Sequence, residues 1–209
     1  MTTLPLMQQV LGDQWEQLPP ALHRHYQHSD NTDTGLLDID YPSFMHPYLS
    51  IMRLFGALIN KRGKNIPTTV PKQMKGDTQY WKRSICFPDG GTVLFKSHWK
   101  YAGGNELIEY INSFLGLRMA VHAEDGHLYY EGRHYVLKLG SVLLPVPEWL
   151  VLGHTTIEEK ALDDEHFYMD FRLQHPLFGQ VFRYAGKFHT SPGKAQQLDP
   201  GRGENADNG

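Results

Sequence analysis

The sequence predicts a single, mainly β domain (α+β class), in which an antiparallel meander of about nine or ten strands forms a strongly curved or barrel-like sheet. Apolar and polar residues alternate with a period of two from residue 66 to residue 188. Tight turns separate these short segments and no long crossover helix follows any of them, which excludes a parallel βαβ organisation. A chain of 209 residues with 40% hydrophobic composition can bury a sizeable core without disulfides or metals.

The first 60 residues are predicted to form the helical part of the domain. Apolar residues recur at helical spacing in residues 4–18 and 43–59, and a short helix is expected at residues 21–27. Residues 27–42 are polar and rich in turn formers, so a loop is expected there. Because the C-terminus offers no helix for a sheet to wrap around, we expect the N-terminal helices to pack on the curved sheet or to cap it.

Two hairpins and three later strands are predicted in residues 66–188. Residues 78–87 pair with 92–101 across a Pro-Asp-Gly-Gly turn, and residues 117–121 pair with 128–130 across Glu-Asp-Gly. The later strands are residues 154–162, 167–173 and 180–188. Residues 144–150 contain two prolines and are therefore predicted to form a rim or lid rather than an interior strand. The domain is expected to span residues 1–189, with a flexible tail at 190–209.

Composition narrows the functional classes. The formal charge is −3, with 20 basic and 23 acidic residues interspersed along the chain, which argues against a nucleic-acid partner. The longest apolar stretch, residues 44–59, is interrupted by polar residues and is too short for a transmembrane segment. No signal peptide is recognisable, and the single cysteine, Cys86, permits no internal disulfide. We therefore expect a cytoplasmic protein.

Motifs for catalysis or cofactors are absent from the sequence. His23, His25 and His28 are close together, but no acidic residue completes a zinc set, so we interpret them as a polar helix end. Cys86 lies within a strand and is interpreted as a packing residue. No nucleophile elbow and no glycine-rich phosphate loop occurs. No metal or cofactor is expected, and the sequence favours a protein that is not an enzyme.

Arg83 is the most informative polar residue, because it shares a strand face with apolar residues. If this face is buried, the guanidinium needs a partner, and Glu109 has the matching strand parity; Glu159 is a weaker candidate. Arg83 could then bind a carboxylate or phosphate of a ligand inside a cavity, or it could form a structural ion pair, or the face could be exposed. Most aromatic residues of the strands are expected to be core, but several could line such a cavity: Trp81, Phe87, Phe95, Trp99, Tyr130, Phe171, Phe182 and Tyr184.

An ordered series of motifs resembles a bacterial family, domain of unknown function 4166. The motifs are Leu-Pro-Pro-Ala-Leu-His-Arg-His-Tyr from residue 18, Tyr-Trp-Lys-Arg-Ser from 80, Glu-Leu-Ile-Glu from 106, Leu-Pro-Val-Pro-Glu-Trp-Leu from 144, Ile-Glu-Glu from 157 and His-Pro-Leu-Phe-Gly-Gln-Val-Phe-Arg-Tyr-Ala-Gly from 175. The resemblance covers residues 18–188. It implies a domain that occurs alone or attached to dehydrogenase-like or membrane partners, with no assigned activity. The matching positions are Trp81, Arg83, Glu109, Pro145, Pro176, Gly179, Tyr184 and Gly186. Residues 110–114 lack the basic character expected after the glutamate.

Three functional hypotheses follow. The first is binding of a small, largely apolar or amphipathic molecule in a barrel cavity of at least about 300 Å³. Its candidate ligand-binding residues are Arg83, Glu109, Trp81, Trp99 and Tyr184. The second is a cavity enzyme of isomerase or cyclase type that uses a carboxylate or histidine as base. The third is an accessory protein–protein interaction domain that uses a strand edge or the rim at residues 145–149, with an unknown protein partner.

Overall fold

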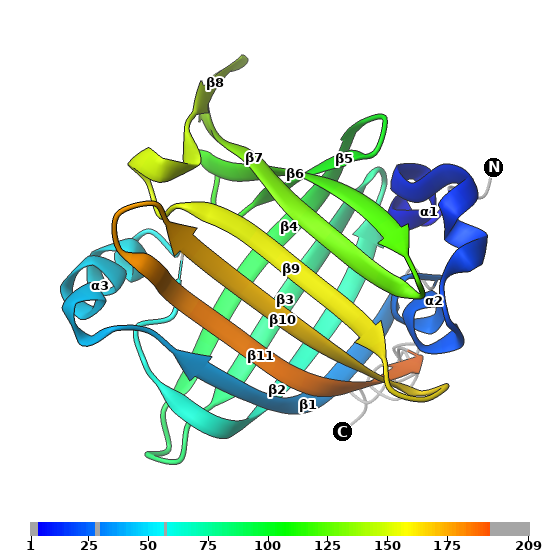
Figure 1. Cartoon of the computed structure of the whole chain (residues 1–209), viewed down its shortest axis with the longest axis horizontal. Coiled ribbons are helices and arrows are strands. Elements are labelled where there is room, and N and C mark those ends of the chain that lie inside the picture. Colours follow the sequence, from blue (N-terminus) through cyan, green and yellow to red (C-terminus); the bar gives the residue numbers. More distant parts are fainter. Residues whose placement is uncertain (1–3, 28–29, 57, 193–209) are drawn as a thin grey trace, which may run out of the picture.

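A computed structural model describes residues 4–27, 30–56 and 58–192 and shows a closed antiparallel β-barrel (Figure 1). Ten strands form its wall, in the order β1-β2-β3-β4-β5-β6-β7-β9-β10-β11, and the β6–β7 pairing completes the ring. The eleventh strand, β8, pairs with β7 at the edge of the sheet. The strands are β1 Asp30–Asp40, β2 Gly63–Lys75, β3 Thr78–Cys86, β4 Thr92–Gly103, β5 Glu106–Tyr110, β6 Leu115–Glu124, β7 His127–Leu139, β8 Val142–Val146, β9 His154–Ala161, β10 His166–His175 and β11 Gly179–Pro192. The predicted fold class is confirmed.

Both hairpins that were predicted from turn-forming residues are present in the structure. β3 and β4 pair in register from Thr78↔Lys100 to Cys86↔Thr92, and β6 and β7 pair around the Asp125–Gly126 turn. The three later predicted strands are β9, β10 and β11. Every strand pairing of the barrel is antiparallel, as expected for strands joined by short turns.

The predicted loop at residues 27–42 is wrong, because residues 30–40 form β1. This strand pairs with β2 on one side and with β11 on the other, so it joins the two ends of the chain into one wall. Its polar N-terminal half favours turns locally, but hydrogen bonding to two neighbouring strands overrides that preference. Asn31, Asp33, Leu37 and Ile39 are buried on its inner face.

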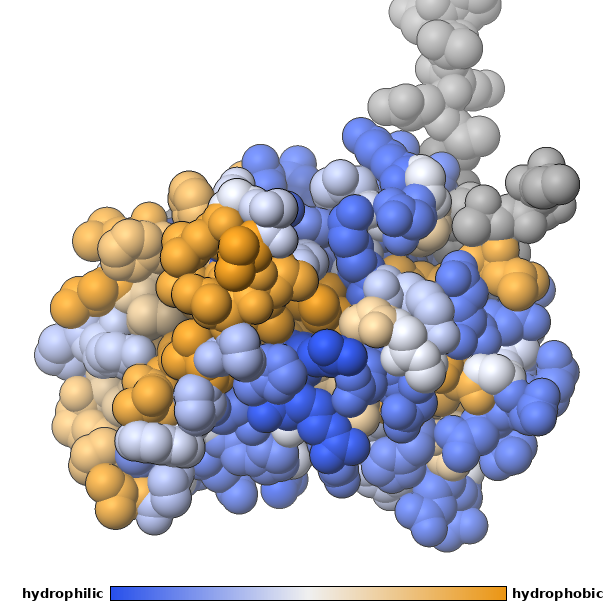
Figure 2. Space-filling view, turned by 90° about the horizontal axis from the view of Figure 1, so that it is seen from above, coloured by the Kyte–Doolittle hydropathy of each residue, from blue (hydrophilic) through white to orange (hydrophobic). Residues whose placement is uncertain are grey.

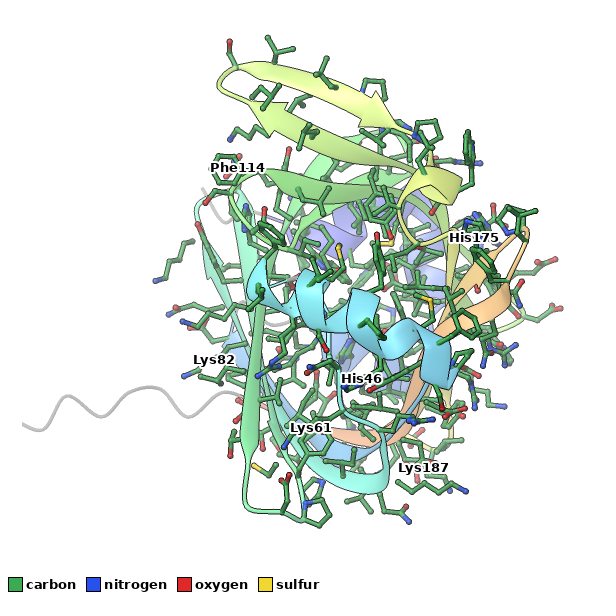
Figure 3. The ribbon with its side chains drawn as sticks, turned by 90° about the vertical axis from the view of Figure 1, so that its left-hand side faces the viewer. His46, Lys61, Lys82, Phe114, His175 and Lys187 are labelled. Atoms are coloured by element: carbon green, nitrogen blue, oxygen red, sulfur yellow. The ribbon has the colours of Figure 1, made fainter. Side chains whose placement is uncertain are left out.

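Helices cover the two ends of the barrel (Figure 1). α1 (Leu6–Leu11), the 3₁₀ helix Gly12–Gln17 and α2 (Pro20–Gln27) pack at one end, where α2 inserts His25 and Tyr26 into the interior. At the other end, α3 (His46–Leu54) follows a 3₁₀ turn at Ser43–Met45 and lies across the opening (Figure 3). The expected capping by N-terminal helices is confirmed, although the helix predicted at residues 43–59 ends at Leu54.

The rim predicted at residues 144–150 contains the C-terminal part of β8 and the 3₁₀ helix Glu148–Leu150, and β8 is an edge strand. This placement agrees with the rule that proline is tolerated at sheet edges. Among the residues that the structure describes, no helix has the length and apolar character needed to cross a membrane. Most of the tail predicted at residues 190–209 lies outside the described residues, and its first residues continue β11 to Pro192.

Candidate functional site

The interior of the barrel contains a cavity of about 90 Å³, lined by side chains from the inner faces of the strands, from α2 and from connecting segments at the α3 end. The expected volume of at least about 300 Å³ is wrong for this closed barrel. Aromatic rings and long aliphatic side chains fill most of the interior, so little space is left. All five predicted ligand-binding residues line this cavity: Trp81, Arg83, Trp99, Glu109 and Tyr184.

Arg83 points into the barrel and is paired with Glu109. The Arg83 Nη2 atom lies 3.2 Å from Glu109 Oε1, and Nη1 donates a hydrogen bond of 2.8 Å to Ser97 Oγ. The guanidinium also lies over the Trp81 ring, 5.2 Å from its centroid. Although burial disfavours the charged guanidinium, Glu109 and Tyr184 raise the pKa of Arg83 above its usual value. Arg83 therefore stays charged inside the barrel.

Two indole rings stand beside this ion pair. Trp81 and Trp99 have ring centroids 4.5 Å apart, and both side chains are almost fully buried. Neither indole N–H has a hydrogen-bond partner within the described part of the chain. A buried donor without a partner costs about 1–3 kcal/mol. The two N–H groups are therefore available to an oxygen atom that enters the cavity.

α2 places the imidazole ring of His25 beside the cavity, next to two buried charged residues. The Nδ1 atom of His25 lies 3.1 Å from Asp33 Oδ2 and 2.9 Å from Lys72 Nζ, and Lys72 is 3.0 Å from the same Asp33 oxygen. Asp33 also accepts a hydrogen bond of 2.7 Å from Thr190. These contacts occupy Nδ1. The buried Nε2 lies 3.9 Å from Glu159 Oε1 and has no hydrogen-bond partner in residues 4–27, 30–56 and 58–192.

A pair of tyrosines completes the buried polar cluster. This cluster consists of His25, Tyr26, Asp33, Lys72, Trp81, Arg83, Trp99, Glu109, Tyr130 and Glu159. The hydroxyl groups of Tyr26 and Tyr130 are hydrogen-bonded to each other, and Tyr26 donates a hydrogen bond of 2.7 Å to Glu159 Oε2. Burial, with the nearby carboxylate, raises the pKa of both phenols well above 10. Both tyrosines are therefore neutral donors at neutral pH.

Burial and pairing act in opposite directions on the acidic groups. Burial favours the neutral form of Asp33, but the charges of His25 and Lys72 outweigh it and lower the pKa of Asp33 to about 2. For Glu159 burial dominates over His25 and Tyr26, and its pKa is raised. Burial likewise lowers the pKa of Lys72, although Asp33 opposes this shift. Such shifts in one enclosed space are typical of functional sites, but structural ion pairs also produce them.

From the sequence alone, residues of α2 and β1 were not predicted to belong to this cluster. His25 was interpreted as part of a polar helix end, and Asp33 lies in the segment predicted to be a loop. Lys72 gave a usable signal, because it continues the buried face of Ile66, Thr68 and Val70 on β2. His28 lies outside the described residues. Within residues 4–27, 30–56 and 58–192, no three His, Cys, Asp or Glu side chains are grouped to hold a metal ion.

Cys86 is exposed, so the interpretation as a buried packing residue is wrong. It belongs to the outer face of β3, opposite the inward face of Trp81, Arg83 and Ile85. Thr92 Oγ1, on the neighbouring strand, donates a hydrogen bond of 3.8 Å to the thiol sulfur. Its position outside the barrel separates it from the polar cluster.

The fold and the site define a class of protein: a closed ten-stranded antiparallel barrel, capped by helices, with ionised and aromatic side chains around a small interior cavity. The chain belongs to the family described as "Domain of unknown function (DUF4166)", whose sequence profile matches residues 18–188. The matched region begins before α2 and ends in β11, so it contains every residue of the site described above except Thr190. No curated protein matches the chain.

Removal of one member of the Arg83–Glu109 pair should destabilise the fold. We expect Arg83→Met to lower the free energy of unfolding by about 3 kcal/mol, because Glu109 is left buried without its counter-charge. The double variant Arg83→Met, Glu109→Leu should recover much of this loss. Urea unfolding followed by circular dichroism measures both effects. Arg172→Met, which breaks a half-exposed pair with Asp170, is the control and should cost about 1 kcal/mol or less. Equal losses in the single and double variants would contradict a coupled pair.

Asp33 should make stability depend on pH at the acidic end of the range. Its folded-state pKa of about 2 lies below the ordinary value of 3.8. The stabilisation is therefore present above the ordinary pKa and is lost as pH falls through the folded pKa. Between about pH 6 and about pH 2, wild type should lose about 2 kcal/mol more stability than Asp33→Asn. Urea unfolding at both pH values measures this difference, with exposed Asp40→Asn as the control. Equal losses in wild type and Asp33→Asn would contradict the assignment.

Proposed function

We propose that the protein binds a small, largely apolar molecule inside the barrel, with one oxygen-bearing polar group held by the buried cluster. The supporting observation is that three buried polar groups have no partner among the residues that the structure describes and belong to side chains that line one cavity. They are the N–H groups of Trp81 and Trp99 and the Nε2 atom of His25. Native proteins keep few buried polar groups unpaired, and those that exist need an explanation.

The chemistry of the lining favours a ligand with a polar end and an apolar body. The polar end faces two indole donors and lies in the positive potential of Arg83, which favours a carboxylate, carbonyl or hydroxyl oxygen. Glu109 already neutralises Arg83, so a full negative charge on the ligand is not required. Most of the remaining lining is apolar and includes Leu37, Ile85, Leu117, Phe171, Leu173 and Phe182.

The cavity volume sets the size of the ligand. A water molecule needs about 10–15 Å³ on the same scale, so 90 Å³ accommodates about six to nine non-hydrogen atoms. A lipid chain or an isoprenoid is larger than the closed barrel can enclose. The proposal therefore concerns short-chain molecules, and a longer ligand would require the barrel to open.

Hexanoate, with about eight non-hydrogen atoms, is a probe of the right size and chemistry. We expect calorimetric titration of the full chain to give a Kd of about 1 mM or tighter. Trp81→Phe keeps the ring but removes the N–H donor, and it should weaken binding about fivefold. Trp149→Phe, at an exposed tryptophan on the rim, should leave the Kd unchanged.

Two outcomes would overturn the proposal. If neither hexanoate nor 1-hexanol binds, the cavity holds water, which then supplies the missing hydrogen bonds. If both probes bind equally to wild type and to Trp81→Phe, they bind outside the buried cluster.

A second candidate function, a cavity enzyme, is favoured by the arrangement of His25. Nδ1 lies 3.1 Å from Asp33 Oδ2 and 2.9 Å from Lys72 Nζ, while Nε2 has no hydrogen-bond partner among the described residues. In the tautomer in which Nδ1 donates to Asp33, Nε2 is a free acceptor beside the cavity, which is the usual arrangement of an imidazole that removes a proton from a substrate. Glu159, 3.9 Å from Nε2, could return the proton at a neighbouring atom, as an isomerase requires.

Turnover of a metabolite mixture tests this second candidate. Wild-type protein is incubated with a small-molecule cell extract, and compounds are resolved by chromatography and mass spectrometry so that isomers are distinguished. An enzyme should convert one compound in large molar excess over protein, and His25→Gln should reduce the rate about 100-fold or more. Changes that do not exceed one equivalent of protein, or that persist in His25→Gln, would exclude His25 as the base.

A further inference from the structure

Large apolar side chains gather on the outside of the barrel at the end where α3 lies. In Figure 2 hydrophobic residues cover much of this end, at the left, and continue toward the middle of the face that is shown. The opposite half is mostly hydrophilic. More than half of each side chain is exposed for Phe55, Phe114, Trp149 and Leu177. We call this surface the apolar rim; it consists of Phe44, Ile51, Leu54, Phe55, Phe114, Leu139, Val142, Leu143, Leu144, Trp149, Leu150, Leu177 and Phe178.

The hairpin of β7 and β8 is the most prominent part of the apolar rim. It projects from the barrel in Figures 1 and 3, and β8 pairs with β7 alone. Leu139 and Val142 are opposite each other at its tip, next to Leu143 and Leu144, and all four are exposed. A two-stranded ribbon is only marginally stable by itself in water, and consecutive exposed apolar residues place hydrophobic surface on both of its faces.

The loops at the α3 end of the barrel and the turns at the opposite end differ in their content of acidic residues. The connections at the α3 end, residues 41–62, 87–91, 111–114, 140–153 and 176–178, contain two acidic residues, Asp89 and Glu148. Asp89 is 2.6 Å from Lys61, and Glu148 is 2.7 Å from His154. The turns at the opposite end, residues 76–77, 104–105, 125–126 and 162–165, contain five acidic and no basic residues.

Basic side chains accompany the apolar rim. Arg53 lies on α3 among exposed apolar residues, Arg62 follows the helix, and Lys138 is next to the tip of the hairpin. A surface that combines exposed apolar and aromatic side chains with arginine and lysine suits the interface of a bilayer with anionic headgroups. Trp149 supplies the amphipathic ring that prefers this depth.

We propose that the apolar rim is a docking surface for an anionic lipid bilayer. A fluid bilayer can cover a surface built from α3, a hairpin and several separate loops, whereas a peptide or helix needs a single groove. A second copy of the chain, related by a two-fold axis, would bring Arg53, Arg62 and Lys138 toward the same cations of its partner.

Leu58 and Ile59, which follow α3, line the interior cavity. Bilayer contact would therefore lie next to the wall of the proposed ligand site.

Co-sedimentation of the full chain with lipid vesicles tests this inference. Wild type should bind vesicles of equimolar phosphatidylcholine and phosphatidylglycerol, and bind less to phosphatidylcholine alone. Leu143→Glu combined with Trp149→Glu should reduce binding to the mixed vesicles about tenfold or more, since two large apolar contacts are lost. Leu162→Glu, an equally exposed leucine at the opposite end, is the matched control and should bind like wild type.

A charge variant separates the two contributions. Arg53→Glu with Lys138→Glu should reduce binding to the mixed vesicles and leave binding to phosphatidylcholine unchanged. Thermal melts should show that all variants fold, because the changed side chains are exposed or half-buried.

The inference is overturned if wild type stays in the supernatant with both vesicles, or if the Leu143, Trp149 variant binds like wild type. A wild-type dimer in light scattering that this variant converts to a monomer would assign the rim to a second copy instead. The result does not depend on hexanoate binding, so the two proposals can fail separately.

Discussion

Closure of the sheet is the constraint on which the rest of the structure depends. The pairing of β6 with β7, and of the N-terminal β1 with the C-terminal β11, turns an open meander into a ring whose ten strands satisfy one another. Barrels of about eight strands are just filled by their own side chains, and a ring of ten encloses more space. The additional interior must be occupied, and in this protein aromatic rings and a polar cluster occupy it.

The polar cluster is costly in such an interior unless each charge has a partner. Arg83 is neutralised by Glu109, and Lys72 by Asp33, so each ion pair balances itself within the barrel. Replacement of buried ion pairs by apolar residues of similar size is often neutral or stabilising. Two such pairs together with two unpaired indole donors are therefore poorly explained by stability alone. The proposed recognition of a small ligand would account for both features.

The sequence predicts the strands and one half of the site well, for identifiable reasons. Strict alternation on β3 placed Trp81 and Arg83 on one face, and the matching parity of Glu109 on β5 correctly identified the partner of Arg83. The half of the site contributed by α2 and β1 could not be predicted in the same way. Asp33 lies among turn-forming residues whose strand conformation depends on β2 and β11, which are distant in sequence. The cavity volume also depends on how large rings pack together, which strand periodicity does not specify.

The ligand site proposed for the polar cluster inside the barrel and the bilayer-docking surface proposed for the apolar rim outside it are independent of each other. The central claim is that the interior cluster is a ligand site. Native mass spectrometry of gently purified full-length protein, followed by denaturing extraction, tests this claim most directly. The account predicts an excess mass that corresponds to a small organic molecule, is released on denaturation, and is lost or reduced in Trp81→Phe. A mass equal to that of the chain alone, in wild type and variant alike, would contradict it.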